Sequence, residues 1–108
     1  MPTDPRAEYD ALVAEMTAAA PVTSGKMMGM PCLKNDVGKM FAGFFQDAMV
    51  FKLGAPEHAI ALALAGARLF DPSEMGRPMK EWVVVPVDHA SRWQEFAEAA
   101  LTYSAKAR

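Results

Sequence analysis

The chain has 108 residues, of which 52% are hydrophobic, and its formal net charge is −2. These values predict one domain, residues 1–108, with an ample core, and they argue against disorder, which requires low hydrophobicity with high net charge. They also exclude a general attraction to nucleic acid or to an anionic membrane, although residues 21–80 hold more basic than acidic residues.

The first predicted element is a helix near residues 5–20. Asp4 is a favourable N-cap, Pro5 suits the first helical position, and Pro21 ends the helix. Apolar side chains recur between them at helical spacing, which predicts one buried stripe. The stripe comprises Tyr9, Leu12, Val13, Met16 and Ala20.

Helical spacing disappears between Val22 and Leu53, where glycines recur and Val, Phe and Met are frequent. We predict three strands there, at about 24–31, 37–44 and 48–53. Asn35-Asp36 is expected to form the first turn, and Gln46-Asp47 the second, which closes a tight antiparallel hairpin. Alternation along the last strand predicts that Lys52 points away from the face that holds Phe51.

The second half of the chain predicts a helix near 56–65, a short strand at Arg68–Phe70 and a loop from Asp71 to Pro78. A strong strand signal follows at 81–85, and a last helix is expected over 88–105, with Asp88 as its cap. Its apolar stripe includes Trp93, Phe96 and Leu101, which we expect to be buried against the sheet together with Leu12 and Met16.

The predicted order is α-β-β-β-α-β-β-α. Such an order favours an α+β fold in which an antiparallel sheet of about five strands is covered by helices.

Cys32 is the single cysteine, so the chain forms no internal disulfide. This fits a reducing compartment, and neither a signal peptide nor an apolar run long enough for a membrane helix is recognisable, so we expect a cytoplasmic protein. A reactive thiol needs a base or a positive neighbour. We expect Cys32 to be an inert, partly buried residue.

The other candidates for chemistry are weak. His58 and His89 lie in no ligand-spaced motif, and each is expected to be an exposed residue in the first turn of a helix. Met27, Met28, Met30 and Met40, with Cys32, suggest soft-metal ligands, but methionines in strands are more often core filler.

The sequence also has neither a phosphate-loop pattern nor a nucleophile elbow. We therefore predict no catalytic residues, no metal, no cofactor and no enzymatic activity.

Basic residues on the predicted strands remain as binding candidates. Lys26 and Lys52 lie on strands, while Arg77 and Lys80 flank the loop that leads into the last strand. They are candidate contacts for an anion or for a partner. The alternative is a set of solvated lysines that protect strand edges from aggregation.

Three runs of the sequence resemble the TfoX N-terminal domain family: Gly25-Lys26-Met27-Met28-Gly29-Met30, Gly38-Lys39-Met40-Phe41-Ala42 and Asp47-Ala48-Met49-Val50-Phe51-Lys52. Further on, the stretches 66–70 and 78–86 and Trp93 also fit the family pattern, so the likeness covers about residues 6–104. It implies the α-β-β-β-α-β-β-α order given above, in a fold similar to type III secretion chaperones. The family includes a regulator of bacterial DNA-uptake competence and offers no catalytic residues to carry over.

The sequence thus predicts a non-enzymatic regulatory module that acts through contact with an unidentified protein partner, as a monomer or weak homodimer. We expect no strong binding to nucleic acid and none to membranes. The alternative is a nucleic-acid-associated regulatory factor that uses a small basic patch.

Overall fold

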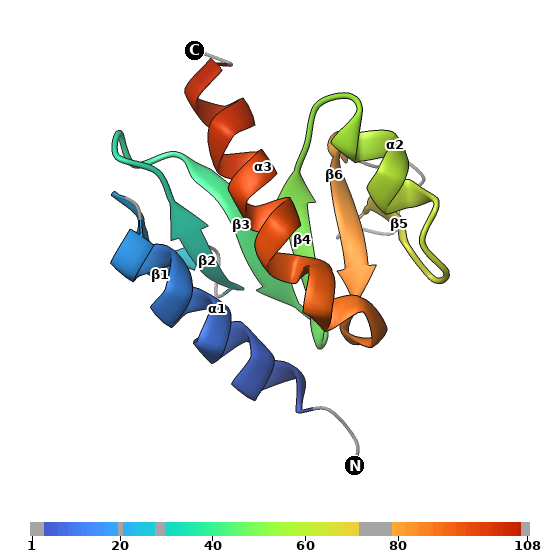
Figure 1. The fold of residues 1–108 in the computed structure, drawn as a ribbon, viewed down its shortest axis with the longest axis horizontal. Helices are drawn as coiled ribbons and strands as arrows, with labels where there is room; N and C mark the ends of the chain where they lie inside the picture. Colours follow the sequence, from blue (N-terminus) through green and yellow to red (C-terminus); the bar gives the residue numbers. More distant parts are fainter. Residues whose placement is uncertain (1–3, 20, 28–29, 72–78, 107–108) are drawn as a thin grey trace.

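The computed structural model describes residues 4–19, 21–27, 30–71 and 79–106. Within these residues six strands form one antiparallel sheet, with helices packed on one of its faces (Figure 1). The predicted α+β class is confirmed, with six strands rather than five. The elements are α1 (Pro5–Ala19), β1 (Thr23–Met27), β2 (Met30–Lys34), β3 (Met40–Phe45), β4 (Ala48–Lys52), α2 (Glu57–Leu62), β5 (Arg68–Phe70), β6 (Met79–Pro86), the 3-10 helix η1 (Val87–Arg92) and α3 (Trp93–Lys106).

The additional strand arises because the single strand predicted at 24–31 was wrong. Two strands occupy this region, β1 and β2, and they pair antiparallel from Thr23 with Lys34 to Met27 with Met30. Residues 28–29 between them lie outside the described residues. Methionines are frequent at this point of the sequence. An Asn-Gly or Asp-Gly pair, which would have predicted a hairpin turn, is absent from it.

Both predicted turns are confirmed. Between β2 and β3, the side-chain oxygen of Asn35 accepts hydrogen bonds from the backbone N–H groups of Val37 (3.0 Å) and Lys39 (2.9 Å). Since this turn extends to Lys39, β3 begins at Met40 and not at 37. Between β3 and β4, Gln46 and Asp47 have φ of 49° and 65°, the left-handed conformation that a tight two-residue hairpin requires.

A β-bulge in β3 adds an aromatic ring to the core. Leu33 pairs with Ala42 whereas Lys34 pairs with Met40, so Phe41 is the extra residue. Phe41 and Ala42 are both 0% exposed and belong to the same core cluster. The bulge therefore turns two consecutive side chains toward one face of the sheet.

The strand order is β1-β2-β3-β4-β6-β5. Paired residues share a face, and alternate residues face opposite ways. The face that contains Phe51 and its partner Val83 lies under α1 and α3, and we call it the covered face. The face that contains Val50 and its partner Val84 is the open face.

The main core lies between the covered face and the helices. Trp93 of α3 is 1% exposed, and its ring N–H donates a hydrogen bond to the carbonyl of Val85 (3.2 Å). Phe96 packs against Phe51 with ring centroids 6.0 Å apart. The burial predicted for Leu12, Met16, Trp93 and Phe96 is confirmed, while Leu101 is only partly buried.

The helix ends differ from the prediction at two of the three helices. In α1, the backbone N–H of Arg6 donates to Asp4 Oδ1 (3.1 Å), as expected of an N-cap. The second helix is shorter than the predicted 56–65, because it ends at Leu62. The last helix begins as the 3-10 turn η1, where His89 leaves helical geometry with φ of −111°, and α3 follows from Trp93. Among the described residues, every helix is too short or too polar to cross a bilayer.

Candidate binding face

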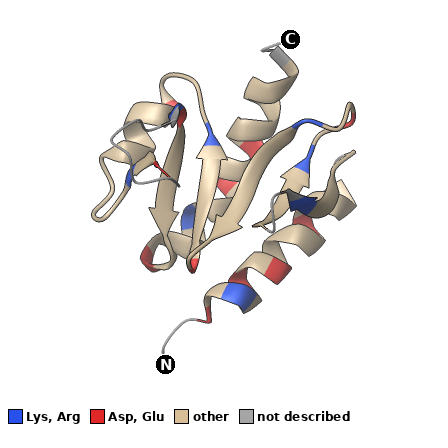
Figure 2. Cartoon of the chain, turned by 180° about the vertical axis from the view of Figure 1, so that it is seen from behind, with Lys and Arg blue, Asp and Glu red and all other residues tan. Residues whose placement is uncertain are grey.

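The open face is formed by the strands alone in the described residues. Seen from behind, α3 passes on the far side of the strands and α1 lies beyond the edge strand β1 (Figure 2). A sheet side that is free of helices is where an antiparallel sheet meets solvent or a partner.

A second apolar cluster occupies the middle of this face. Ala48, Val50, Phe70 and Val84 are its buried residues, and Met30, Phe45 and Trp82 pack around them while partly exposed. The rings of Phe45 and Phe70 meet edge to face with centroids 5.1 Å apart. The cluster therefore spans five strands, β2 to β6, and its partly exposed side chains come from β2, β3 and β6.

Gly43 allows two methionines to lie across the centre of the sheet. A Cβ built at this position would come within 2.7 Å of Met30 Cε and 2.8 Å of Met40 Cε. Glycine thus provides the space that these two side chains fill. Since thioether side chains are flexible, they give this part of the face an adaptable apolar surface.

Basic residues lie at one end and at one edge of the apolar cluster. Lys34, Lys52, Arg68 and Lys80 occupy strand positions on the open face, as the registers of β2, β4, β5 and β6 show. In the described strands, every acidic side chain lies elsewhere, since Glu81 points to the covered side and bonds to Tyr103 of α3. The open face is therefore cationic although the chain is acidic overall.

The helices on the other side carry the opposite charge. The described part of α1 holds Glu8, Asp10 and Glu15 against Arg6, and α3 adds Glu95 and Glu98. Figure 2 shows the acidic residues mainly on the helices and the basic ones mainly on the strands. The separation of charge gives the two sides of the molecule different electrostatic surfaces.

The structure brings together only part of the predicted contact set. Lys52 pairs with Trp82, and Lys80 lies two residues before Trp82, so the two lysines are diagonal neighbours on the open face. Lys52 points away from the face of Phe51, as predicted. Lys26 lies on the edge strand β1 and pairs with Pro31 on the covered side, so it is not part of this group. Arg77 lies outside the described residues.

Sequence reasoning missed Lys34 and Arg68, as well as the apolar residues Met30, Phe45 and Trp82. The available signal was the alternation in Met30-Pro31-Cys32-Leu33-Lys34, which places Met30, Cys32 and Lys34 at every second position. This alternation was missed because the sequence analysis predicted a single strand over 24–31.

Cys32 lies in the middle of β2, next to the edge strand β1, and is 0% exposed. Burial raises the pKa of its thiol, against a smaller opposing effect of Lys34. A protonated and inaccessible thiol is a poor nucleophile, so Cys32 has the properties of a core residue.

The two histidines are not the freely exposed residues that the sequence predicted. The ring of His58 hydrogen-bonds the carbonyl of Lys80 (2.7 Å), and that of His89 bonds the carbonyl of Ala65 (2.8 Å). Both are partly buried and link sequence-distant segments. Among the described residues, His, Cys, Asp and Glu side chains do not gather in groups of three that would hold a metal ion.

Comparison with protein families, with curated proteins and with solved structures gives no match to this chain.

Proposed function

We propose that the protein is a non-enzymatic binding module whose open face docks an amphipathic segment of a partner protein. The segment would combine apolar residues with acidic residues toward one end. The proposal rests on one observation: the face that no described helix covers combines an apolar cluster with cations at one end and one edge, and lacks carboxylates at its described strand positions.

The composition of the face favours a protein partner of this kind. Aromatic residues and methionine are enriched at protein interfaces, and Phe45, Trp82 and the flexible Met30 lie partly exposed on this face. Lys34, Lys52 and Lys80 complement carboxylates on the partner, which speeds association and sets orientation. The acidic helices on the other side of the molecule would repel the same segment.

A non-enzymatic role agrees with the chemistry of the described residues. Catalysis needs a nucleophile, an acid–base pair or a metal within reach of a substrate. Cys32 is inaccessible, and each histidine ring bonds a backbone carbonyl. The resemblance of the sequence to the TfoX N-terminal domain family supports a regulatory role.

Selection from a display library of random 16-residue peptides tests the proposal. Peptides are selected on the wild-type protein and depleted on a Lys34→Glu/Lys52→Glu variant. We expect the remaining peptides to be rich in Asp and Glu interspersed with aliphatic and aromatic residues. Their affinity should fall about tenfold or more in Lys52→Glu and in Trp82→Ala.

Lys26→Glu is the matched control, because it makes the same charge change on the other side of the sheet. Affinity for the selected peptides should change less than about twofold in this variant. Peptides without acidic residues, or equal losses in Lys26→Glu and Lys52→Glu, would refute the proposed docking face.

A titration with short duplex and single-stranded DNA at low and moderate salt examines the alternative partner. Non-specific binding of DNA-binding proteins lies at about 10⁻⁴–10⁻⁶ M at physiological salt. Binding clearly tighter than this, and lost in Lys52→Glu, would replace the protein partner by a nucleic acid.

A further inference from the structure

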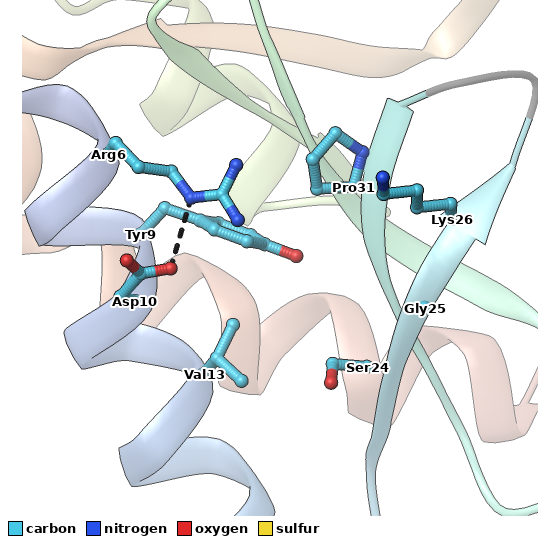
Figure 3. Close-up of a pocket in the computed structure, with 8 residues that line it drawn as sticks. All are labelled: Arg6, Tyr9, Asp10, Val13, Ser24, Gly25, Lys26 and Pro31. Atoms are coloured by element: carbon cyan, nitrogen blue, oxygen red, sulfur yellow. Dashed lines mark hydrogen bonds and ion pairs between the residues drawn. The ribbon is translucent and has the colours of Figure 1, made fainter.

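A groove lies between α1 and the β1–β2 hairpin, on the covered side and at the edge of the sheet (Figure 3). Its volume is about 250 Å³. One wall is α1, with Arg6, Tyr9, Asp10 and Val13, and the other is the β1–β2 hairpin, with Ser24, Lys26 and Pro31 (Figure 3). The polar residues are Arg6, Tyr9, Asp10, Ser24 and Lys26.

The hydroxyl of Tyr9 is the polar group that distinguishes this groove. The residue is 3% exposed, and its ring stacks on Phe44 with centroids 5.1 Å apart. Figure 3 shows the hydroxyl pointing away from α1 and toward the hairpin. This hydroxyl makes no hydrogen bond within the described part of the chain, although it is not sealed from the groove. A buried ring with an unpartnered hydroxyl at its tip is suited to receive a ligand.

Tyr9 acts as a hydrogen-bond donor at neutral pH. Burial raises the pKa of its hydroxyl to about 12, with a further upward effect of Cys32 and a downward effect of Arg6. The phenol therefore keeps its proton and can donate it to an acceptor in the groove.

Two cationic side chains, Arg6 and Lys26, line the groove together with this hydroxyl. Arg6 is held in place because its Nε donates to Asp10 Oδ1 (3.1 Å) and its guanidinium carbon lies 5.6 Å from the centre of the Tyr9 ring. Figure 3 shows its terminal nitrogens extending over that ring, while Lys26 turns from β1 back toward Pro31. With Asp10 included, the groove carries one net positive charge, and Ser24 adds a further hydroxyl.

We propose that the groove binds a small organic anion, whose carboxylate or phosphate contacts Tyr9, Arg6 and Lys26 and whose short apolar group lies against Val13 and Pro31. A hydroxyl donor in a groove lined by two cationic side chains matches the acceptors of such an anion. The volume is near the lower end of small-molecule sites, which limits the ligand to about the size of one substituted ring. The site is separate from the open face, so its failure would leave the proposed function intact.

Amide-resolved NMR titration tests this site with phenyl phosphate, benzoate, inorganic phosphate and benzyl alcohol. We expect saturable shifts of the amides of Ser24, Gly25 and Lys26 with phenyl phosphate or benzoate, and the tighter of the two identifies the head group. Inorganic phosphate should bind more weakly, and benzyl alcohol should cause no saturable shift. Failure of both aromatic anions to saturate would refute the site.

Variants decide whether these residues hold the anion. Tyr9→Phe removes only the hydroxyl and keeps the ring in the core, and it should weaken binding about tenfold. Lys26→Met should act similarly, whereas Lys52→Met on the open face should have no effect. Equal affinity in wild type and in both groove variants would overturn the proposal.

Discussion

The two faces of the sheet use similar residue types for different purposes. On the covered face, Phe51 lies 6.0 Å from Phe96 of α3, and both are almost completely buried. On the open face, Phe45 of β3 meets Phe70 of the edge strand β5 and remains partly exposed. An aromatic side chain thus stabilises the fold where a helix covers it. Where no described helix covers it, the side chain forms part of the surface. The charges follow the same division, with carboxylates on the helices and cations on the open strands.

The largest difference between the faces should appear when aromatic residues are truncated. Phe96→Ala removes a ring from the centre of the main core and should lower the free energy of unfolding by about 3–5 kcal/mol. Phe45→Ala removes a ring that is already partly in water, so we expect a loss of roughly 1–2 kcal/mol. Urea denaturation measures both. Equal losses would mean that the open face is as much a core as the covered one.

Tyr9, whose ring is buried, makes the covered side sensitive to alkaline pH. Its pKa in the folded protein is raised to about 12 from an ordinary value of 10.0. A raised pKa means that the folded state holds the proton more tightly, so stability is intact below pH 10 and falls as the pH rises toward 12. By linkage the loss reaches at most about 2–3 kcal/mol.

Unfolding free energies at pH 9 and pH 11, in wild type and Tyr9→Phe, measure this effect. The decrease should be smaller in the variant. Tyr103→Phe measures the separate share of the decrease that comes from Tyr103, whose pKa is raised by its hydrogen bond to Glu81. A decrease that is unchanged by Tyr9→Phe would contradict the assignment.

Two glycines offer a matched comparison of backbone space. A Cβ at Gly54 would lie 2.6 Å from Cε1 of the Tyr103 ring, which is stiff and is held by Glu81. Gly54→Ala should therefore cost about 1–3 kcal/mol. At Gly43 the nearest atoms are the terminal methyls of Met30 and Met40, which can move aside, so Gly43→Ala should cost less than about 1 kcal/mol. Thermal unfolding measures the loss of stability in each variant. A larger loss in Gly43→Ala than in Gly54→Ala would show that the methionines are fixed in place.

The smallest expected change in stability comes from reversing charge on the open face. Lys52→Glu places a carboxylate beside Lys80 and should alter the free energy of unfolding by no more than about 0.5 kcal/mol. Peptide affinity should nevertheless fall in the same variant. A large loss of stability would instead assign Lys52 a structural role.

The success of the sequence predictions depended on whether the signal was local. The helical stripe that contains Trp93 and Phe96 repeats within one helix, so their burial was predicted correctly. The turn at Gln46-Asp47 was also recognisable, because hairpin turns depend on a few adjacent residues. The reversal between β1 and β2 was missed because it falls within a run of methionines. The bulge at Phe41 had no sequence signal, since it is defined by the pairing of β3 with β2.

For the candidate binding sites, too, the sequence predicted only local features. Lys26, Lys52 and Lys80 were recognised as basic residues on or beside strands, but their grouping was not. Lys52 and Lys80 share the open face, whereas Lys26 lies four strands from β6 along the sheet, in the groove beside α1. Lys34 and Arg68 join the open face only because β2 and β5 are placed in register with their neighbours.

The amino-acid sequence by itself determined the α+β class, the helix and strand types of most segments, and the stripe that forms the main core. These follow from periodicity and turn chemistry, which act over a few residues. Strand order, register and the choice of covered face were decided by the tertiary structure, because they depend on contacts between distant residues. A shift of one residue in register would exchange the two faces of a strand. The cationic open face and the groove at Tyr9 exist only through that long-range arrangement.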